Sequence, residues 1–383
     1  MRTALINGRI LAGERIANGQ TVLIADGRIE AIVAPADRRC HGADSVDLQG
    51  HLLLPGFIDV QVNGGGGVLF NDDPSLESIR AIGAAHRRFG TTGFLPTLIS
   101  DDLDTIGQAI AAVQSSLDSH LPGALGIHIE GPFLNLARRG VHDAKHLRRL
   151  DNGVISMLCG LRGGRTVLTL APELTTTDMI AQLAASGILI SAGHSDANYA
   201  QTAAAIAHGV RGFTHLFNAM APLAPREPGI IGAALYDADT WCGIIVDGHH
   251  VDPVMLKLAL RCKRHDRFML VTDAMPAVGS SASSFVLQGR TIHVSNGVCR
   301  DENGTLAGTA LDMATAVRNA VSLLGLEIAE AARMASEYPA AFLGLDDELG
   351  RIAPGYRANL VLLDDALQVR RTWIEGIPSR EPV

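Results

Sequence analysis

Gly126-Ile127-His128-Ile129-Glu130-Gly131-Pro132 is a short apolar run that ends in a carboxylate and is then broken by glycine and proline. Side chains alternate in direction along a strand, so His128 and Glu130 share one face and the two isoleucines share the other. The pattern predicts a buried strand with Glu130 at its end. Taken alone, an acidic residue before Gly-Pro more often opens a solvated loop.

Three later stretches repeat this pattern. Segments 191–195 (SAGHS) and 213–218 (FTHLFN) run β-prone residues into a histidine, and segment 270–273 (LVTD) runs them into an aspartate. Four polar strand ends in one chain indicate a shared edge of a sheet where these side chains meet. The residues concerned are Glu130, His194, His215 and Asp273.

Strand-like and helix-like segments alternate through the middle of the chain, which predicts parallel β-α units with covered faces. Eight apolar strand candidates lie at 57–62, 93–98, 124–130, 167–171, 188–194, 212–215, 242–246 and 268–273. Eight alternations favour an α/β fold of the (β/α)8 TIM barrel type over a doubly wound sheet. In that fold the carboxyl ends of the strands form the active-site face, which is where the four polar residues fall.

Helix candidates separate the strands, and several begin at an Asp, Ser or Thr that can cap a helix. They lie at 74–89, 103–117, 152–161, 177–186, 197–208 and 253–262. Segment 222–239 is interrupted by proline and glycine, so its helix is the least clearly predicted. After the eighth strand we expect a small β excursion over 285–300 and closing helices over 312–324 and 328–343.

Both chain ends read as short strands separated by turn pairs such as Asn7-Gly8 and Asp26-Gly27. Two β segments at opposite ends of a chain can pair into one small β domain. We therefore expect a small domain of residues 1–52 and 348–383 beside a barrel of residues 53–347.

Composition limits the classes of partner. The 383-residue chain is 47% hydrophobic, and its formal net charge of −8 comes without long runs of one sign, so nucleic acid is not an expected partner. No stretch approaches the ~18 continuous apolar residues of a membrane span, and the amino terminus lacks an apolar signal core. The five scattered cysteines have no Cys-x-x-Cys spacing, which indicates free thiols. We expect a cytoplasmic protein with no membrane partner.

Glu130, His194 and His215 make a two-histidine, one-carboxylate set that suits a borderline divalent metal with one open position. Zinc is the expected ion, with iron, manganese or cobalt as alternatives. Each histidine by itself would more often be an ordinary core or surface residue, but joint placement at barrel strand ends favours a metal site. Asp273 is then placed to take a proton from an attacking water and return one to a leaving group, unless it only caps a helix.

Six segments together resemble the motifs of the N-acetylglucosamine-6-phosphate deacetylases, a family of the amidohydrolase superfamily. They are 59–64 (DVQVNG), 128–132 (HIEGP), 193–195 (GHS), 214–215 (TH), 247–252 (DGHHVD) and 272–274 (TDA). The resemblance implies a barrel with a β-sandwich of both chain ends and a metal on the three residues named above. It also implies a homodimer that hydrolyses the acetamide of N-acetylglucosamine 6-phosphate to glucosamine 6-phosphate and acetate, in amino-sugar catabolism.

The same resemblance implies roles for further residues. His142 would hydrogen-bond the acetyl carbonyl and, with Asp273, would be catalytic. Arg226 would reach the phosphate of the neighbouring subunit's substrate. Its planar fork of donors suits a phosphate, although an isolated arginine is more often a surface residue. The substrate-binding positions implied are Gln61, Val141, Asn218, Ala219, Arg226, His250, Leu306, Ala307 and Gly308.

One segment departs from the wider superfamily, in which His-x-His at the end of the first strand helps to hold a second metal. This chain has Gln61-Val62-Asn63, and amide side chains are poor ligands for zinc-like ions. A branch of the deacetylase family shares the change. We therefore expect one divalent ion per subunit.

Two alternatives remain open. The first is the same deacetylation with N-acetylgalactosamine 6-phosphate as the substrate. The two sugars differ in the configuration of one hydroxyl, which a sequence cannot resolve. The Gln-x-Asn pattern favours the glucosamine substrate. The second is an inactive sugar-phosphate-binding protein, against which the intact set of expected catalytic and metal residues argues. The glycines of 64–67 resemble a phosphate cradle but are better explained as a flexible turn.

Overall fold

The barrel is an eight-stranded sheet with the order β15-β14-β13-β12-β11-β10-β9-β6, in a computed structural model that describes residues 2–379. All neighbouring strands in it are parallel, as predicted for a (β/α)8 barrel. The strands are β6 (Phe57–Val62), β9 (Thr91–Ile99), β10 (Gly126–Glu130), β11 (Arg165–Leu170), β12 (Leu189–Ala192), β13 (Val210–Phe213), β14 (Trp241–Ile244) and β15 (Phe268–Leu270). They follow the eight predicted segments in order.

Burial explains why these segments form a parallel sheet. Every residue of β6, β9 and β10 is buried, as expected for strands covered on both faces. The sheet closes between its first and last strands just beyond β15, where the Asp273 N–H donates to the Gln61 carbonyl at 3.0 Å and the Asn63 N–H donates to the Ala274 carbonyl at 2.9 Å. These bonds place the ends of β6 and β15 side by side.

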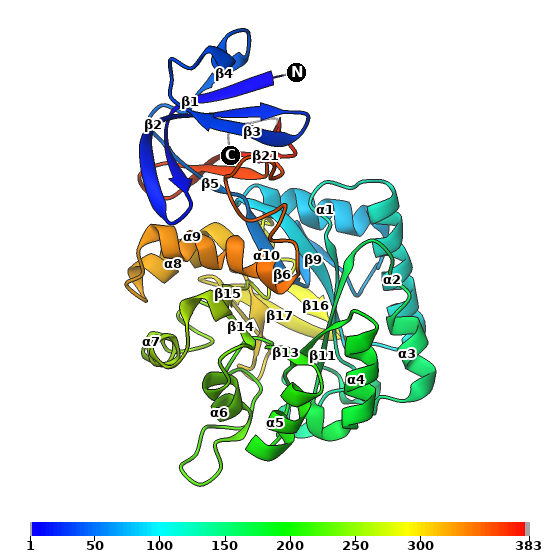
Figure 1. Ribbon diagram of the computed structural model, residues 1–383. Coiled ribbons are helices and arrows are strands. Elements are labelled where there is room, and N and C mark those ends of the chain that lie inside the picture. The colour runs from blue at the N-terminus through cyan, green and yellow to red at the C-terminus, as the bar shows by residue number, and fades with distance from the viewer. Residues whose placement is uncertain (1, 380–383) are drawn as a thin grey trace.

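Helices cover the outside of the barrel (Figure 1). They are α1 (Leu76–Arg87), α2 (Leu103–Asp118), α3 (Asn152–Leu158), α4 (Thr177–Ala185), α5 (Tyr199–Ala207), α6 (Gly229–Tyr236), α7 (Pro253–Cys262) and α8 (Met313–Ser322). Polar caps start most of them: the side chain of Asp102 accepts from the Thr105 N–H, and Asn198 forms a capping box with Gln201. The weakly predicted helix of segment 222–239 is thus present as the short α6.

The single helix expected over 328–343 is wrong. The chain forms α9 (Ile328–Met334) and α10 (Glu337–Phe342), separated at Ser336, whose backbone has φ −140° and ψ −69°. The Ala335 carbonyl accepts from the Ile58 N–H at 2.7 Å, so this break is tied to the first barrel strand. A periodic pattern does not reveal such a tertiary contact.

A second sheet draws on both ends of the chain (Figure 1). Its strands are β1 (Arg2–Ala12), β2 (Arg15–Ala25), β3 (Arg28–Val33), β4 (Asp44–Asp47), β5 (Leu52–Pro55), β20 (Leu360–Leu363), β21 (Val369–Ile374) and β22 (Ile377–Pro378). Antiparallel pairing of β20 with β5 joins the two ends, and Trp373 packs in the core with Leu5 and Leu53. The expected pairing of the termini is present, while residues 380–383 of that expectation lie outside the described residues. The division at 52/53 and 347/348 stays a prediction.

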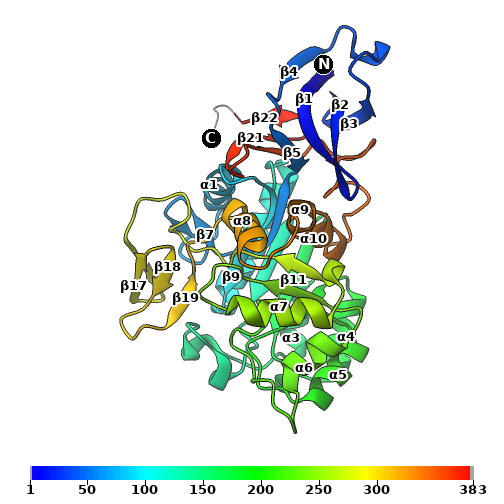
Figure 2. The same ribbon diagram turned by 90° about the vertical axis from the view of Figure 1, so that its left-hand side faces the viewer.

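A third sheet follows the eighth barrel strand and stands to one side of the barrel (Figure 2). It comprises β16 (Ser284–Leu287), β17 (Arg290–Ser295), β18 (Val298–Arg300) and β19 (Leu306–Thr309). The β excursion expected over 285–300 is present, and β19 extends it back to the barrel. There the Thr309 N–H donates to the Asp273 carbonyl at 3.0 Å, so this sheet is anchored beside the polar strand ends.

The remaining elements are short. A two-stranded sheet pairs β7 (Gly64–Gly65) with β8 (Val68–Leu69), and 3-10 helices lie at Arg38–Cys40, Leu136–Arg138, Ala144–His146, Pro172–Leu174 and His265–Arg267. Within residues 2–379, no helix combines the length and apolar character that crossing a membrane requires.

Candidate metal centre and substrate cavity

Three of the four predicted strand-end residues lie just beyond their strands. β12, β13 and β15 end two or three residues before His194, His215 and Asp273. Each of the three has a left-handed backbone, with φ of 48°, 33° and 51° respectively. This region costs a residue with a side chain on the order of 1–3 kcal/mol, and such strain is concentrated at functional sites. The left-handed turns end the strands earlier than predicted.

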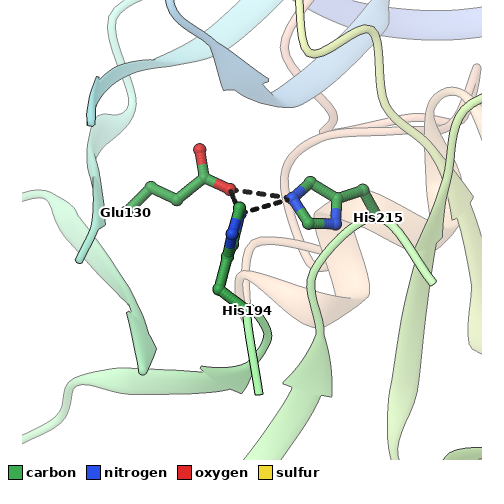
Figure 3. Close-up of side chains that lie close together, drawn as sticks. All are labelled: Glu130, His194 and His215. Carbon is green, nitrogen blue, oxygen red and sulfur yellow. Dashed lines mark hydrogen bonds and ion pairs between the residues drawn. The ribbon is translucent and has the colours of Figure 1, made fainter. Parts of the chain in front are cut away.

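Glu130, His194 and His215 converge, as Figure 3 shows. The His215 Nε2 atom lies 3.0 Å from Glu130 Oε1 and 3.0 Å from His194 Nε2, and His194 Nε2 lies 3.3 Å from Glu130 Oε1. All three side chains are buried. Within residues 2–379 this is the one group of three or more His, Cys, Asp or Glu residues found close enough to hold a metal.

A hydrogen bond orients His194 as a potential metal ligand. Its Nδ1 lies 3.0 Å from the Arg138 carbonyl, which can only accept, so Nδ1 carries a proton and Nε2 is the ring nitrogen left to bind a metal. Nε2 faces the Glu130 carboxylate. Burial opposes ionisation of Glu130, but hydrogen bonds and charge from the two imidazoles outweigh it and hold the pKa of its carboxyl well below the usual range. A divalent cation between them would bind the carboxylate oxygen and the two imidazole nitrogens as ligands.

Asp273 faces this group from the end of β15. Its Oδ1 accepts hydrogen bonds from Asn63 Nδ2 at 2.6 Å and from Gln61 Nε2 at 3.3 Å. Gln61 also donates to Glu130 Oε1 at 3.0 Å, so one amide bridges the two carboxylates. Burial, followed by the charge of Glu130, raises the pKa of Asp273 to about 6. The carboxylate thus has a proton affinity suited to acid/base work.

His142 is held in one tautomer by Ser100. The Ser100 backbone N–H points at His142 Nδ1 at 3.3 Å, and the Ser100 hydroxyl lies 2.7 Å from the same atom. Because a backbone N–H only donates, Nδ1 must accept and Nε2 carries the proton. Burial, then the neighbouring charge of His194, lowers the pKa of His142 to about 3, so the ring stays neutral near pH 7. Its Nε2–H is a neutral donor.

A cavity of about 400 Å³ joins these groups. Its volume lies within the range of small-molecule sites. Predicted residues that line it are Glu130, Val141, His142, His194, His215, Asn218, Ala219, His250, Asp273, Leu306 and Gly308. Two hollows of about 600 Å³ lie elsewhere, at the opposite ends of the barrel strands, and contain none of this polar group.

Three predicted substrate residues do not line the cavity. Gln61 lies behind Glu130 and Asp273 and reaches the site through its amide hydrogen bonds. Ala307 is fully buried, so its neighbours Leu306 and Gly308 form that part of the wall. Arg226 is exposed in the loop before α6, outside the cavity of its own chain.

His250 lines the cavity with its ring oriented by a neighbour. Its Nδ1 donates to Asp247 Oδ2 at 2.6 Å. Burial of Asp247 opposes ionisation, but the hydrogen bond from His250 prevails and lowers the pKa of that carboxyl to about 2. The Nε2 atom of His250 is therefore the ring nitrogen left to meet a ligand.

Sequence reasoning missed several lining residues. They are Ile99, Gly140, Met275, Arg300, Gly304 and Thr305. Gly140 and Met275 were detectable as neighbours of expected site residues. Arg300 had no signal, because an arginine after an alternating strand normally predicts a solvent-facing side chain.

Asp59 also escaped prediction as a structural partner of the site. Its buried carboxylate accepts from the Gln61 N–H at 3.1 Å, from the Thr272 N–H at 3.4 Å and from the Thr272 hydroxyl at 2.5 Å. It therefore links the first and last barrel strands next to Asp273. Burial, only partly offset by these three donors, raises the pKa of Asp59 to about 7.

Comparison with known proteins identifies the family. Residues 52–380 match the sequence model of the Amidohydrolase family. The chain belongs to the amidohydrolase family. This amidohydrolase is 37% identical over 379 residues to the N-acetylglucosamine-6-phosphate deacetylase of Haemophilus influenzae, covering 98% of this chain and 99% of that one. It is 45% identical over 324 residues to the N-acetylgalactosamine-6-phosphate deacetylase of Shewanella sp. (strain ANA-3), covering 85% and 82%.

Solved structures of deacetylases have the same fold as this chain. The amidohydrolase superposes on the N-acetylglucosamine-6-phosphate deacetylase of Pasteurella multocida with a TM-score of 0.96 and 36% identity, covering 99% of this chain and 100% of that one. A mutant deacetylase of Mycobacterium smegmatis, in complex with N-acetyl-D-glucosamine-6-phosphate, gives a TM-score of 0.89 and 32% identity, covering 98% and 99%. The resemblance inferred from six short motifs, and the barrel fold it implied, are thereby confirmed.

Proposed function

We propose that this chain hydrolyses the acetamide of an N-acetylamino sugar 6-phosphate, with N-acetylglucosamine 6-phosphate as the expected substrate. The products are the amino sugar phosphate and acetate, as in amino-sugar catabolism. One observation carries the proposal: Glu130, His194 and His215 face Asp273 and the Nε2–H of His142 across a single cavity. The curated relatives named above carry this activity in their names.

Each residue of the site has a separate role in the proposed reaction. A divalent cation bound by Glu130, His194 and His215 would supply Lewis-acid polarisation and activation of water. Asp273 takes a proton from the attacking water and delivers one to the departing amine. His142 donates its Nε2–H to the acetyl oxygen, a bond that strengthens as negative charge develops there. We expect zinc as the ion, with iron, manganese or cobalt as alternatives.

Acetate release tests the activity directly. Purified protein with a defined content of one metal at a time is offered N-acetylglucosamine 6-phosphate and N-acetylgalactosamine 6-phosphate. We expect release that is lost on chelation and regained on metal addition. No release from either sugar phosphate by metal-replete protein would refute the proposal.

The galactosamine substrate is the second candidate. It is favoured by the 45% identity to the Shewanella relative, which exceeds the 37% identity to the Haemophilus relative. The amide pair Gln61 and Asn63 favours the glucosamine substrate, as argued from the sequence. The ratio of kcat/KM for the two sugar phosphates in the same assay decides between them.

We further propose a homodimer in which Arg226 reaches the phosphate bound in the neighbouring subunit. In support, Arg226 is exposed and lies outside its own cavity. Two large apolar side chains of the surrounding sequence are also exposed: Leu223, in the same loop, at 53% and Tyr236, the last residue of α6, at 81%. Large apolar side chains exposed in one subunit are often covered at subunit contacts.

Mixing two inactive variants tests the shared site. Arg226→Ala protein and Asp273→Asn protein are combined under conditions in which subunit exchange is demonstrated. If Arg226 acts across the interface, mixed dimers regain one site with an intact aspartate from one chain and an intact arginine from the other. No recovery despite exchange places Arg226 in its own subunit's site or outside the site.

A cytoplasmic location is part of the proposal. All five cysteines are free, although Cys40, Cys159 and Cys262 are at least partly accessible. Free accessible thiols are typical of a reducing compartment.

A further inference from the structure

The cavity contains one Arg or Lys side chain among the described residues that line it, and that residue is Arg300. The other ionisable groups of the lining are the carboxylates Glu130 and Asp273 and four histidines, three of which surround the candidate metal centre. His142 is neutral, and two histidines are expected to be ligands. A doubly charged anion that enters this cavity therefore meets few cationic groups from the same chain.

Arg300 belongs to a hydrogen-bonded turn. It ends β18, and its Nη1 donates to the Gly304 carbonyl at 2.9 Å. The carboxylate of Asp301 closes the turn by accepting from the Asn303 N–H at 2.9 Å and from the Thr305 N–H at 2.8 Å. Gly304 and Thr305 line the cavity together with Arg300.

The same turn is tied to the wall that carries His142. Arg290 places Nη1 3.8 Å from Asp301 Oδ2 and donates from Nη2 to the Val141 carbonyl at 2.6 Å. One arginine therefore connects the turn after β18 with the residue before His142. These contacts hold the turn beside the segment that carries His142 before any ligand binds, and such preorganisation lowers the entropy cost of binding.

The guanidinium of Arg300 keeps most of its donors free. An arginine carries five N–H donors, and the structure shows one hydrogen bond from this side chain. Within residues 2–379 it makes no ion pair, in contrast to Arg290 on the neighbouring strand. Arg300 is exposed at the edge of the cavity, and it lines that cavity without a carboxylate partner among the described residues.

We propose that Arg300 binds the phosphate of the substrate from the same chain, as a specificity-determining residue for phosphorylated sugars. The inference rests on the proposed function, because it assumes a sugar phosphate as ligand. A planar guanidinium matches a phosphate through two parallel N–H···O bonds. Arg300 and the partner subunit's copy of Arg226 would then hold one dianion from two chains.

Three variants test this role. Arg300→Gln removes the charge, Arg300→Lys keeps the charge but loses the fork, and Arg370→Gln is the matched control. Arg370 lies on β21 of the sheet formed by the chain ends and is half exposed. Its replacement by Gln changes the net charge by the same amount as Arg300→Gln. kcat and KM are measured for N-acetylglucosamine 6-phosphate and for unphosphorylated N-acetylglucosamine.

We expect Arg300→Gln to lower kcat/KM for the phosphorylated substrate by roughly 10- to 100-fold, the range of a lost hydrogen bond to a charged group. Activity on the unphosphorylated sugar should change less than about twofold, and Arg300→Lys should recover part of the loss. Equal loss on both sugars would mean that Arg300 contacts the sugar ring and would overturn the phosphate assignment. No change on either sugar would leave Arg300 as a solvent-facing residue and would also overturn it.

Calorimetry separates failure of this inference from failure of the proposed function. Binding of glucosamine 6-phosphate and of glucosamine is measured for the same variants. If the wild-type protein releases no acetate, the proposed function fails, yet the inference still requires that Arg300→Gln weaken binding of the phosphorylated sugar alone. The phosphate assignment of Arg300 is refuted if wild type and Arg300→Gln bind glucosamine 6-phosphate equally well. It is also refuted if neither protein binds this sugar phosphate.

Discussion

Replacing Asp273 with asparagine should abolish most turnover while the fold and the metal centre stay intact. Asp273 Oδ1 accepts hydrogen bonds from Asn63 at 2.6 Å and from Gln61 at 3.3 Å. An asparagine oxygen at the same position can accept both, so neither buried amide loses its acceptor. In the proposed mechanism, the variant loses the ability to carry a proton from the attacking water to the departing amine.

The expected magnitude follows from these contacts. Loss of a general acid/base lowers the rate by ~100-fold to 10,000-fold, which corresponds to about 3–5 kcal/mol in the activation free energy. Asp273→Ala offers a contrast, because it leaves the buried Asn63 Nδ2 without its acceptor at a cost of about 1–3 kcal/mol of stability. Asn63 Oδ1 has no hydrogen-bond partner among the described residues. The Asn63 amide therefore has no other side-chain hydrogen bond that could offset the lost one.

Three measurements on each variant check the reasoning. They are acetate release, metal content by elemental analysis and the midpoint of thermal unfolding. We expect Asp273→Asn to be metal-replete, near native in stability and nearly inactive, and Asp273→Ala to be inactive and less stable. Near-native turnover in metal-replete Asp273→Asn would show that another group moves the proton. Equal losses of stability in both variants would contradict the hydrogen-bond argument.

Three further predictions concern the surroundings of Asp273. His142→Ala should lower kcat by about 100-fold or more with a smaller change in KM, because its donor acts mainly on the developing oxyanion; steady-state kinetics showing a change in KM alone would contradict this. Fully active protein should hold one divalent ion per chain, and a second tightly held ion ligated by Gln61 or Asn63 in metal analysis would end that claim. Burial raises the pKa of Asp59 to about 7. Between pH ~4 and ~7 the folded protein therefore keeps a proton on this carboxyl that the unfolded chain has already released. The free energy of unfolding falls as the pH rises through that window. The stability of Asp59→Asn relative to wild type should therefore increase over that window, by up to ~4 kcal/mol, and a pH-independent difference in denaturant unfolding would refute the assignment.

The barrel could be predicted because its signals are local. A run of β-prone residues that ends in a polar residue occurs at the four strand ends that carry Glu130, His194, His215 and Asp273, and helix caps such as Asp102 mark the intervening helices. Those features depend on residues a few positions apart. The same local reasoning made the strands before His194, His215 and Asp273 too long, because it could not detect their left-handed backbones.

Other features had no local signal. The break at Ser336 depends on a hydrogen bond between Ala335 and the first barrel strand, which lies far away in sequence. Arg300 faces the cavity only because β19 returns the third sheet to the barrel beside Asp273. In each case the deciding contact joins segments whose approach depends on the packing of the whole chain.

The sequence by itself determined the fold class and the set of candidate ligands, since hydrophobic period, turn residues and strand-end polar groups are properties of short segments. The tertiary structure alone decided how those groups are tuned. Ser100 selects the tautomer of His142 from 42 residues away, and Asp59 meets Thr272 across 213 residues where the barrel closes. Such contacts depend on the register of strands that are distant in sequence, and barrel closure, not any local pattern, brings them within hydrogen-bond distance.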